Sequence, residues 1–499
     1  MERHSHWIGG APHPGSSGLQ GEIYDPATGE VIALVDYASA AEVALAVDAA
    51  ERAFRTWGRS SLATRTQVLF RFRALVDANR RKLAEAITRE HGKVLDDARG
   101  EVARGLEVVE FACGIPQLIQ GGFSAGVSSD VDSYTFRQPL GVVAGITPFN
   151  FPAMVPMWMH PLAIACGNTF VLKPSERDPG VSLLVASLWK EAGLPDGVFN
   201  VIQGDRVAVE VLVGHPAVKA VSFVGSTPVA RSIHHAASVA GKKVQALGGA
   251  KNHMVVLADA DMDAAADAAV SAAFGSAGER CMAISVVVAV EPAADRLVAA
   301  VTRRAAKIRV GPGNVAGMDM GPLITAAHRD RVAALIAEGE SEGAILVLDG
   351  RGTAVQDHPN GFWLGPCVMD GVRPAMKAYQ EEIFGPVLQV LRAASLGEAI
   401  EVINHNQYGN GAAIFTASGG AARRFEQEVQ VGMIGVNVPI PVPTAHYSFG
   451  GWKDSLFGES HVYGEDGVRF YTRGKVVTRR WQEVRSEGVD LAFPGQRPR

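Results

Sequence analysis

Short runs of β-branched and apolar residues alternate with helical segments between residues 140 and 257. The strand-like runs are Leu140–Ile146, Thr169–Leu172, Val198–Val201, Ala220–Val224 and Met254–Leu257. The segments Ser182–Glu191 and Val229–Val239 between them have apolar residues at helical spacing. Because strands that alternate with helices form parallel sheets covered by helices on both faces, this region predicts a doubly wound α/β domain.

A second block of the same kind follows. It has strand-like runs at Ile284–Val290, Val387–Leu391 and Gly411–Phe415 and helical patterns at Pro292–Lys307, His328–Glu338 and Ser395–Asn404. Further helices are predicted ahead of both blocks, at Ala41–Ala53, Arg65–Arg89 and Asp97–Ala112. The segments Val127–Arg137 and Val468–Val477 predict strands that belong to neither block. We therefore expect two α/β domains with a small β element outside them.

Composition excludes several other classes of protein. A formal net charge of -5 gives no reason to expect a nucleic-acid partner. Apolar runs such as Ala283–Val290 fall short of the roughly 18–20 residues that span a bilayer, and Met1–Gly10 lacks the pattern of a secretory signal. Four cysteines without C-x-x-C spacing predict neither a disulfide framework nor a metal site. These features favour a cytoplasmic protein that binds no membrane.

Cys281 is the cysteine with the most suggestive surroundings. It lies in Phe274–Met282, where the small residues Gly275–Gly278 would let a loop bring backbone N–H groups close to a reacting atom. Arg280 beside it would favour the thiolate if its charge pointed toward the sulfur. A lone cysteine is more often a small buried hydrophobe, so the local pattern leaves both interpretations open. The other three are predicted to be structural: Cys113, Cys166 and Cys367.

Asn150 lies in Thr147–Pro152, a loop with two prolines that follows a predicted strand. The carboxyl ends of strands are where open α/β sheets bind ligands. An amide held there can donate to a developing oxyanion. The alternative is that Asn150 only serves the turn.

Further loops have the residue types of a nucleotide site. Lys173 and Glu176 follow another strand and could hydrogen-bond ribose hydroxyls, although a solvated loop fits this short motif as well. Ser226 would begin a helix, which suits a phosphate, or it only caps that helix. The glycines Gly248-Gly249 would let the backbone approach a ligand, or they would simply turn the chain. Glu381-Glu382 place two carboxylates before a strand, and the alternative is that they are only surface charges.

Taken together and in this order, these motifs resemble the aldehyde dehydrogenase superfamily from Trp7 to Trp481. The resemblance depends on Thr147–Pro152, Leu172–Pro179, Phe223–Thr227, Gly275–Cys281 and Glu381–Pro386. Within the superfamily, the chain is similar to the methylmalonate-semialdehyde dehydrogenases, which are CoA-acylating. That closer similarity lies in Gly249–His253, Tyr408–Gly411 and Gly435–Pro443.

The resemblance implies an α/β aldehyde dehydrogenase-like fold with two doubly wound domains and a small β oligomerisation element. The NAD-binding domain would comprise residues 1–126 and 143–253, and the catalytic domain residues 254–445. The oligomerisation element and C-terminal return would comprise 127–142 and 446–485, followed by a loose tail at 486–499. The assembly that it implies is a homodimer or homotetramer.

The resemblance also assigns roles to single residues. Cys281 would be the nucleophile, and Asn150 with the backbone N–H of Cys281 would form the oxyanion hole. Lys173 and Glu176 would bind the adenosine ribose of NAD. The other cofactor-binding positions would be Arg177 beside that ribose, Ser226 at the pyrophosphate, Glu382 at the nicotinamide ribose, and Thr147, Phe149 and Gly248 along the cleft.

Ala246 is the position where the chain departs from hydrolytic members of the family. Those enzymes carry a glutamate immediately before the Leu-Gly-Gly that matches Leu247–Gly249, and its carboxylate activates the water that cleaves the thioester. Losing a positioned general base typically removes about 10²–10⁴ in rate. A thiol is far more nucleophilic than water near neutral pH. The sequence therefore predicts that coenzyme A, rather than water, accepts the acyl group.

The closer similarity implies a small semialdehyde substrate that bears a carboxylate, either malonate semialdehyde or its 2-methyl derivative. Oxidation with NAD, loss of CO₂ and transfer to coenzyme A would give acetyl-CoA or propionyl-CoA. Arg104 and Arg280 match the substrate arginines of that subgroup, and a guanidinium fork suits a carboxylate. Two alternatives are a hydrolytic dehydrogenase that uses another base and a non-enzymatic binding protein on the same fold.

Overall fold

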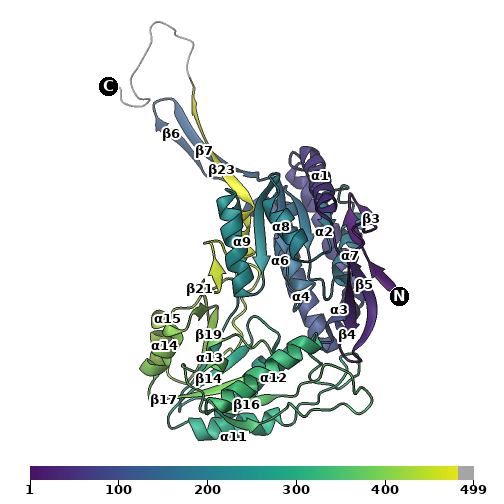
Figure 1. Ribbon diagram of the computed structural model, residues 1–499. Coiled ribbons are helices and arrows are strands. Elements are labelled where there is room, and N and C mark those ends of the chain that lie inside the picture. The colour runs from purple at the N-terminus through teal and green to yellow at the C-terminus, as the bar shows by residue number, and fades with distance from the viewer. Residues whose placement is uncertain (482–499) are drawn as a thin grey trace.

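The computed structural model describes residues 1–481, so the tail expected at 486–499 lies outside the described part of the chain. Helices of the first half of the chain, α1 to α9, surround one sheet, and helices α11 to α15 surround a second (Figure 1). A narrow three-stranded ribbon projects from the body at the end away from the second sheet (Figure 1). Within residues 1–481, no helix is long and apolar enough to cross a membrane.

The first sheet has eight strands in the order β22-β12-β11-β8-β9-β10-β2-β3. Its central strands run parallel: β8 (Val142–Ile146), β9 (Thr169–Lys173), β10 (Phe199–Val201), β11 (Val218–Val224) and β12 (Lys243–Leu247). The antiparallel edge strands are β2 (His6–Ile8), β3 (Ala11–His13) and β22 (Leu456–Phe457). The strand order reverses between β8 and β11. Such a switch point is where open α/β sheets bind ligands.

Helices cover both faces of this sheet, because successive strand residues point to opposite sides. On β8, Val142 and Ala144 pack in one apolar core and Val143 packs in another. One face is covered by α1 (Ala40–Trp57), α8 (Arg206–Gly214) and α9 (Thr227–Val239). The other is covered by α2 (Leu62–Ala78), α3 (Arg80–His91), α4 (Leu95–Cys113), α5 (Ile115–Leu118), α6 (Met154–Ala165) and α7 (Gly180–Glu191).

The helical pattern predicted at Arg65–Arg89 is interrupted once. The segment forms α2 and α3, which are separated at Asn79. The side-chain amide of Asn79 donates to the carbonyl oxygen of Leu75, so this residue closes the first helix. An asparagine that bonds nearby backbone competes with helix propagation, which explains the break.

The second sheet has the order β15-β16-β17-β14-β13-β19-β20. Its strands are β13 (Asn252–Val256), β14 (Ile284–Val290), β15 (Ile345–Leu348), β16 (Cys367–Asp370), β17 (Val387–Ala393), β19 (Gly411–Phe415) and β20 (Met433–Val436). All neighbours are parallel except β15 with β16. The helices of this half are α10 (Met262–Phe274), α11 (Ala294–Ala305), α12 (Ala326–Ser341), α13 (Lys377–Gln380), α14 (Leu396–His405) and α15 (Gly419–Glu428).

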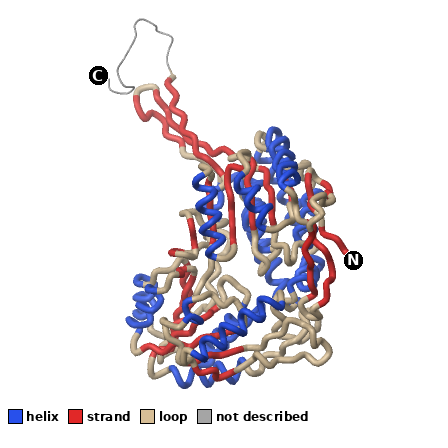
Figure 2. Tube along the Cα trace, viewed as in Figure 1, coloured by secondary structure: helices blue, strands red, loops and turns tan. Residues whose placement is uncertain are grey.

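The ribbon consists of β6 (Phe123–Ser128), β7 (Val131–Pro139) and β23 (Thr472–Arg480), all antiparallel. Figure 2 shows these strands leaving the body together. The late strand expected at Val468–Val477 begins too early, because Val468 belongs to α16 (Gly464–Phe470). Val468 is buried, so its apolar side chain serves the core rather than the ribbon. Two short strands, β18 (Tyr408–Gly409) and β21 (Trp452–Lys453), pair with each other.

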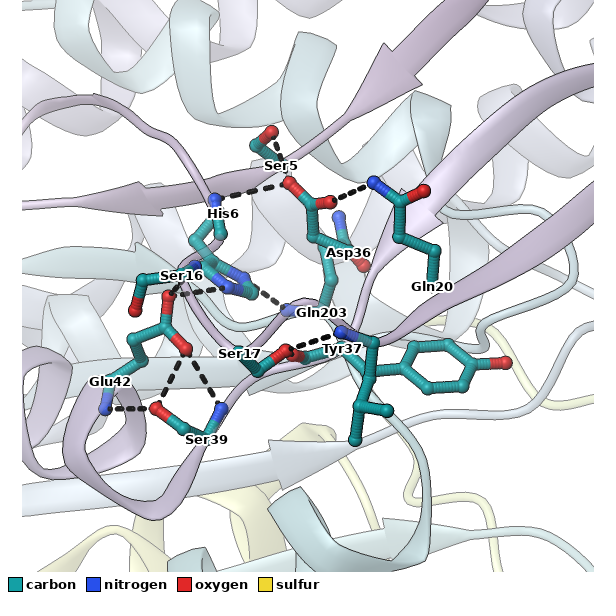
Figure 3. Close-up of polar contacts among 12 residues, drawn as sticks. Ser5, His6, Ser16, Ser17, Gln20, Asp36, Tyr37, Ser39, Glu42 and Gln203 are labelled. Atoms are coloured by element: carbon teal, nitrogen blue, oxygen red, sulfur yellow. Dashed lines mark hydrogen bonds and ion pairs between the residues drawn. The ribbon is translucent and has the colours of Figure 1, made fainter.

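A polar network holds the N-terminal sheet of β1 (Glu2–His4), β4 (Gln20–Asp25) and β5 (Glu30–Asp36) against α1 (Figure 3). Burial opposes ionisation of Asp36, but hydrogen bonds from Arg3, Ser5 and Gln20 outweigh it and lower the pKa of Asp36 to about 2. Glu42 forms a capping box with Ser39 at the start of α1 and also accepts from the backbone N–H of Ser16. These contacts attach the small three-stranded sheet to the rest of the domain.

Candidate active site

The candidate site lies between the two sheets. The loops that follow β8 and β11 at the switch point of the first sheet contribute Asn150 and Ser226 to one cavity of about 480 Å³. Cys281 lines the same cavity from a loop that leads into the amino end of β14. The carboxyl edge of the first sheet thus faces the amino edge of the second across the site.

The loop before Cys281 has an unusual backbone. Ser276, Ala277 and Gly278 have φ values of 53°, 51° and 73°, in the left-handed region. This conformation costs a residue with a Cβ atom roughly 1–2 kcal/mol, and such strain collects at functional sites. Gly278 adopts this conformation without that cost, whereas Ser276 and Ala277 are strained.

Two asparagines hold the backbone of Cys281. The side-chain amides of Asn252 and Asn410 donate to the Cys281 carbonyl oxygen at 2.9 and 3.0 Å. Asn252 begins β13 and Asn410 immediately precedes β19. No role was predicted for either residue, although they lie in the motifs Gly249–His253 and Tyr408–Gly411. Their polar side chains at the start of buried strands were the available signal.

Arg280 favours the thiolate of Cys281, as expected, but other groups outweigh its effect. Burial and the nearby carboxylate of Glu382 raise the pKa of the Cys281 thiol to about 12. Arg280 has a smaller effect on that thiol, and its guanidinium donates instead to Asp97. Cys281 is half-buried, whereas Cys113, Cys166 and Cys367 are buried, as predicted for structural cysteines.

Asn150 is held by a buried ion pair that the sequence analysis missed. The ammonium of Lys93 lies 2.5 Å from the Asn150 carbonyl oxygen and 2.8 Å from Glu101 Oε2. The other oxygen of Glu101 accepts from the N–H groups of Ala153 and Met154, at the start of α6. The loop that carries Asn150 is thus fastened on both sides to Glu101 and Lys93, which lie on and just before α4.

A second cavity of about 770 Å³ continues from the first along the switch point. The two share Phe149 and Ser226 in their walls. Lys173 and Glu176 line the second cavity, and the Lys173 ammonium donates to Glu176 Oε2 at 2.8 Å. Thr147 and Arg177 complete the predicted set there. The result is an elongated cleft of two compartments.

Ser226 lines both compartments and is the N-cap residue of α9. Its side chain forms no capping hydrogen bond, so the simple cap interpretation does not describe it. The free N–H groups at the start of α9 therefore lie next to an exposed hydroxyl, an arrangement that suits a phosphate.

Gly248 and Gly249 keep the first cavity open. A Cβ atom on Gly248 would lie 2.6 Å from the Asp454 carbonyl oxygen, and one on Gly249 would lie 2.3 Å from Glu382 Oε2. Glu382 accepts from the Ala250 N–H at 2.9 Å, and burial raises the pKa of its carboxyl to about 7. The glycines are thus required because side chains there would collide with backbone or with Glu382.

Arg104 and Arg280 line a third cavity of about 240 Å³ together with Cys281. Arg104 donates to Glu107 Oε2 at 2.6 Å and to the Pro443 carbonyl oxygen at 2.8 Å. These two contacts hold Arg104 at the wall of the cavity. The structure brings every residue to which the sequence analysis assigned a role into one continuous site. Their chemical roles stay predictions.

Ala246 presents only a buried methyl group. It lies on β12 between β11 and β22 and is 0% exposed, in the apolar core that also contains Phe223. Its position therefore supplies no carboxylate to the site.

Comparison with known proteins agrees with this geometry. The profile of the aldehyde dehydrogenase family matches residues 14–477. The chain belongs to the aldehyde dehydrogenase family. The fold class expected from the sequence and the superfamily resemblance are thereby confirmed.

Relatives narrow the similarity further. The chain is 54% identical over 480 residues to a malonate-semialdehyde dehydrogenase of Pseudomonas aeruginosa, covering 96% of this chain and 97% of that one. It is 52% identical to the solved methylmalonate-semialdehyde dehydrogenase of Oceanimonas doudoroffii, with a TM-score of 0.96 and coverage of 97% and 99%. A Sinorhizobium meliloti chain assigned to the same group and solved with NAD is 49% identical, with a TM-score of 0.96 and coverage of 97% and 99%.

Proposed function

We propose that this aldehyde dehydrogenase oxidises malonate semialdehyde or methylmalonate semialdehyde with NAD and transfers the acyl group, after loss of CO₂, to coenzyme A. The observation that carries the proposal is the third cavity, where two arginines lie beside the nucleophile candidate Cys281. A carboxylate is the ligand that a pair of guanidinium groups favours. The similarity to relatives named for these substrates supports the same assignment.

The residues of the elongated cleft fit NAD. Lys173 and Glu176 offer a cation and a carboxylate to ribose hydroxyls, the start of α9 at Ser226 suits the pyrophosphate, and Glu382 suits the second ribose. The buried hydroxyl of Thr147 has no hydrogen-bond partner within residues 1–481, as expected of a group that faces a ligand. Bound NAD supplies the acceptor for the hydride that leaves the substrate carbon.

The Cys281 thiol gives up its proton to water, and its sulfur then attacks the aldehyde carbon as the thiolate. The resulting oxyanion accepts hydrogen bonds from the Asn150 amide and the Cys281 N–H. After oxidation the acyl group is a thioester on Cys281. In a malonyl-type thioester the carboxylate carbon departs as CO₂, and the bonding electrons move toward the thioester carbonyl. A proton then completes the acetyl or propionyl group. Arg104 and Arg280 hold the carboxylate until this step.

Coenzyme A completes the reaction as co-substrate. Its thiol attacks the thioester, Cys281 leaves as the thiol, and acetyl-CoA or propionyl-CoA is released. The buried methyl group of Ala246 accounts for the use of a thiol, since no carboxylate at that position activates water.

Single-turnover mixing of enzyme, NAD and malonate semialdehyde tests this proposal. We expect a burst of NADH that stalls, and renewed turnover when coenzyme A is added. Mass spectrometry of the stalled enzyme should find an acetyl group on Cys281. Steady turnover to a free acid without coenzyme A would favour the hydrolytic alternative, and absence of any NADH would favour the non-enzymatic one.

We also propose that the chain assembles through its ribbon as a homodimer or homotetramer. Phe123, Val127 and Val476 on β6 and β23 are 67%, 52% and 70% exposed, and strands that expose apolar side chains tend to associate. Light scattering after size-exclusion chromatography should show a larger particle for the native chain than for Val476→Lys. The free state of the four cysteines supports a cytoplasmic location, which cell fractionation tests.

A further inference from the structure

Asp97 contacts Arg280 inside the third cavity. Asp97 lies in the first turn of α4, and its Oδ1 accepts a hydrogen bond from Nη2 of Arg280. The two side chains are 14% and 22% exposed, so this is a largely desolvated pair. The second oxygen of Asp97, Oδ2, is buried without a hydrogen-bond partner within residues 1–481.

Gly275, in the loop that leads to Cys281, also restrains the Arg280 guanidinium. A Cβ atom on Gly275 would lie 2.5 Å from Arg280 Nη1 and 2.6 Å from its Cζ. The guanidinium therefore rests against the backbone of the loop that leads to Cys281. Arg280 is thus held by Asp97 on α4. It also lies against the backbone at Gly275, where any larger residue would collide with it.

This arrangement leaves donors of Arg280 for a ligand. One N–H of its five points to Asp97, and the side chain still lines the cavity with Arg104 and Cys281. An arginine side chain has many rotamers, and a guanidinium that is already ordered loses less of that rotamer entropy on binding.

We propose that Asp97 is a positioning residue that orients Arg280 toward the carboxylate of the substrate. Selectivity for aldehydes that bear a carboxylate then depends on Asp97 as well as on the arginines. The proposal rests on the semialdehyde substrate of the proposed function.

Asp96 provides a matched control. It occupies the same first turn of α4, where an acidic side chain stabilises the start of a helix. Its side chain is 88% exposed and pairs with Arg99 instead. A substitution at Asp96 therefore removes the same charge from the same turn without touching Arg280.

The test compares kinetic constants for malonate semialdehyde and propanal in Asp97→Ala, Asp97→Asn and Asp96→Ala. We expect Asp97→Ala to raise KM for malonate semialdehyde about tenfold or more, the effect of losing a charge-assisted hydrogen bond, and to leave propanal nearly unchanged. Asp97→Asn keeps an acceptor oxygen, so its KM for malonate semialdehyde should rise less than that of Asp97→Ala. Asp96→Ala should match the native enzyme on both substrates. Equal losses on both substrates in Asp97→Ala, or none, would overturn the proposal.

Gly275→Ala tests the same idea by an independent route. The new methyl group must displace the Arg280 guanidinium. We therefore expect activity on malonate semialdehyde to fall more than activity on propanal. A Gly275→Ala enzyme with native selectivity would show that the position of Arg280 does not govern carboxylate binding. Thermal unfolding of each variant identifies any loss of folded protein.

Labelling with phenylglyoxal separates this proposal from the proposed function. Arg280 should react faster in Asp97→Ala than in the native enzyme or Asp96→Ala, as read by mass spectrometry of the Arg280 peptide. Equal rates would overturn the pairing itself. If the native enzyme fails to oxidise malonate semialdehyde while the rates differ, the proposed substrate is wrong and the positioning of Arg280 by Asp97 stands.

Discussion

The ammonium of Lys93 donates to the backbone carbonyl oxygen of Asn150 at 2.5 Å. Lys93 is 1% exposed, and its charge is balanced by Glu101, which is 2% exposed. The same carboxylate accepts from two N–H groups at the start of α6. The oxyanion donor of the proposed mechanism is therefore held by a buried ion pair at the junction of the loop, α4 and α6.

Lys93→Met should destabilise the fold and slow catalysis together. Removing one partner of a buried ion pair leaves the other charge uncompensated, which costs about 3–5 kcal/mol. Urea unfolding measures the loss, and Lys82→Met, at an exposed position of α3, provides the control. A Lys93→Met protein as stable as the control would show that the Lys93–Glu101 pair does not stabilise the fold.

Asn150→Ala should lower kcat by about 10²–10³, or roughly 2.7–4 kcal/mol, since one of two oxyanion donors is lost. The carbonyl oxygen that Lys93 binds belongs to the backbone and remains. Stability and NAD affinity should therefore stay close to native, as measured by thermal unfolding and fluorescence titration. A variant within about threefold of the native rate would show that the side chain only shapes the loop.

Alkylation of Cys281 by iodoacetamide should depend steeply on pH when NAD is absent. Burial and then Glu382 raise the pKa of this thiol to about 12, so the thiolate fraction and the rate should rise about tenfold per pH unit between pH 7 and 10. Mass spectrometry of the Cys281 peptide follows the rate. A plateau near pH 8 would contradict the raised pKa.

Glu382→Gln should accelerate that alkylation. Removing a negative charge lowers the pKa of a nearby thiol. The pKa of the Glu382 carboxyl is about 7, so the acceleration should be present at pH 8–9 and shrink below pH 6, where the native carboxyl is protonated. Glu381→Gln, at the neighbouring position, is the matched control. Equal rates for Glu382→Gln and the control at pH 9 would refute the coupling.

Glu279→Gln should stabilise the protein at alkaline pH. Glu279 is fully buried, with Oε1 3.5 Å from His328 Nε2 and Oε2 3.8 Å from His91 Nε2, and burial raises its pKa to about 8. The folded protein thus keeps a proton that the unfolded chain releases above its ordinary pKa near 4.5. Native stability should fall relative to Glu279→Gln by roughly 1.4 kcal/mol per pH unit across that window. Urea unfolding of both proteins at pH 5 and 8 checks this, and a constant difference would contradict it.

Periodicity in the sequence was sufficient for most of the framework. Alternation at β8 follows from one residue pointing to each face in turn, and the strands at Ile284–Val290 and Gly411–Phe415 lie where they were predicted. Apolar spacing does not predict strands as short as β20 or the break at Asn79. Both depend on local hydrogen bonds and packing that the spacing does not show. The order of the motifs was enough to predict that the cleft residues lie close together. The reason is that loops at the carboxyl ends of parallel strands share one edge of a sheet.

What the sequence determined by itself is the set of groups that can react: a cysteine after a run of small residues, an asparagine after a strand, a glycine pair and an alanine in place of a general base. The tertiary structure decided which neighbouring groups position these reactive residues and set their protonation. Arg280 meets Asp97 across 183 positions of sequence, and Asn410 reaches the Cys281 carbonyl across 129. Such pairs depend on how two sheets pack against each other. The protonation of Cys281 depends on burial and on the field of Glu382, and both exist only when the chain is folded.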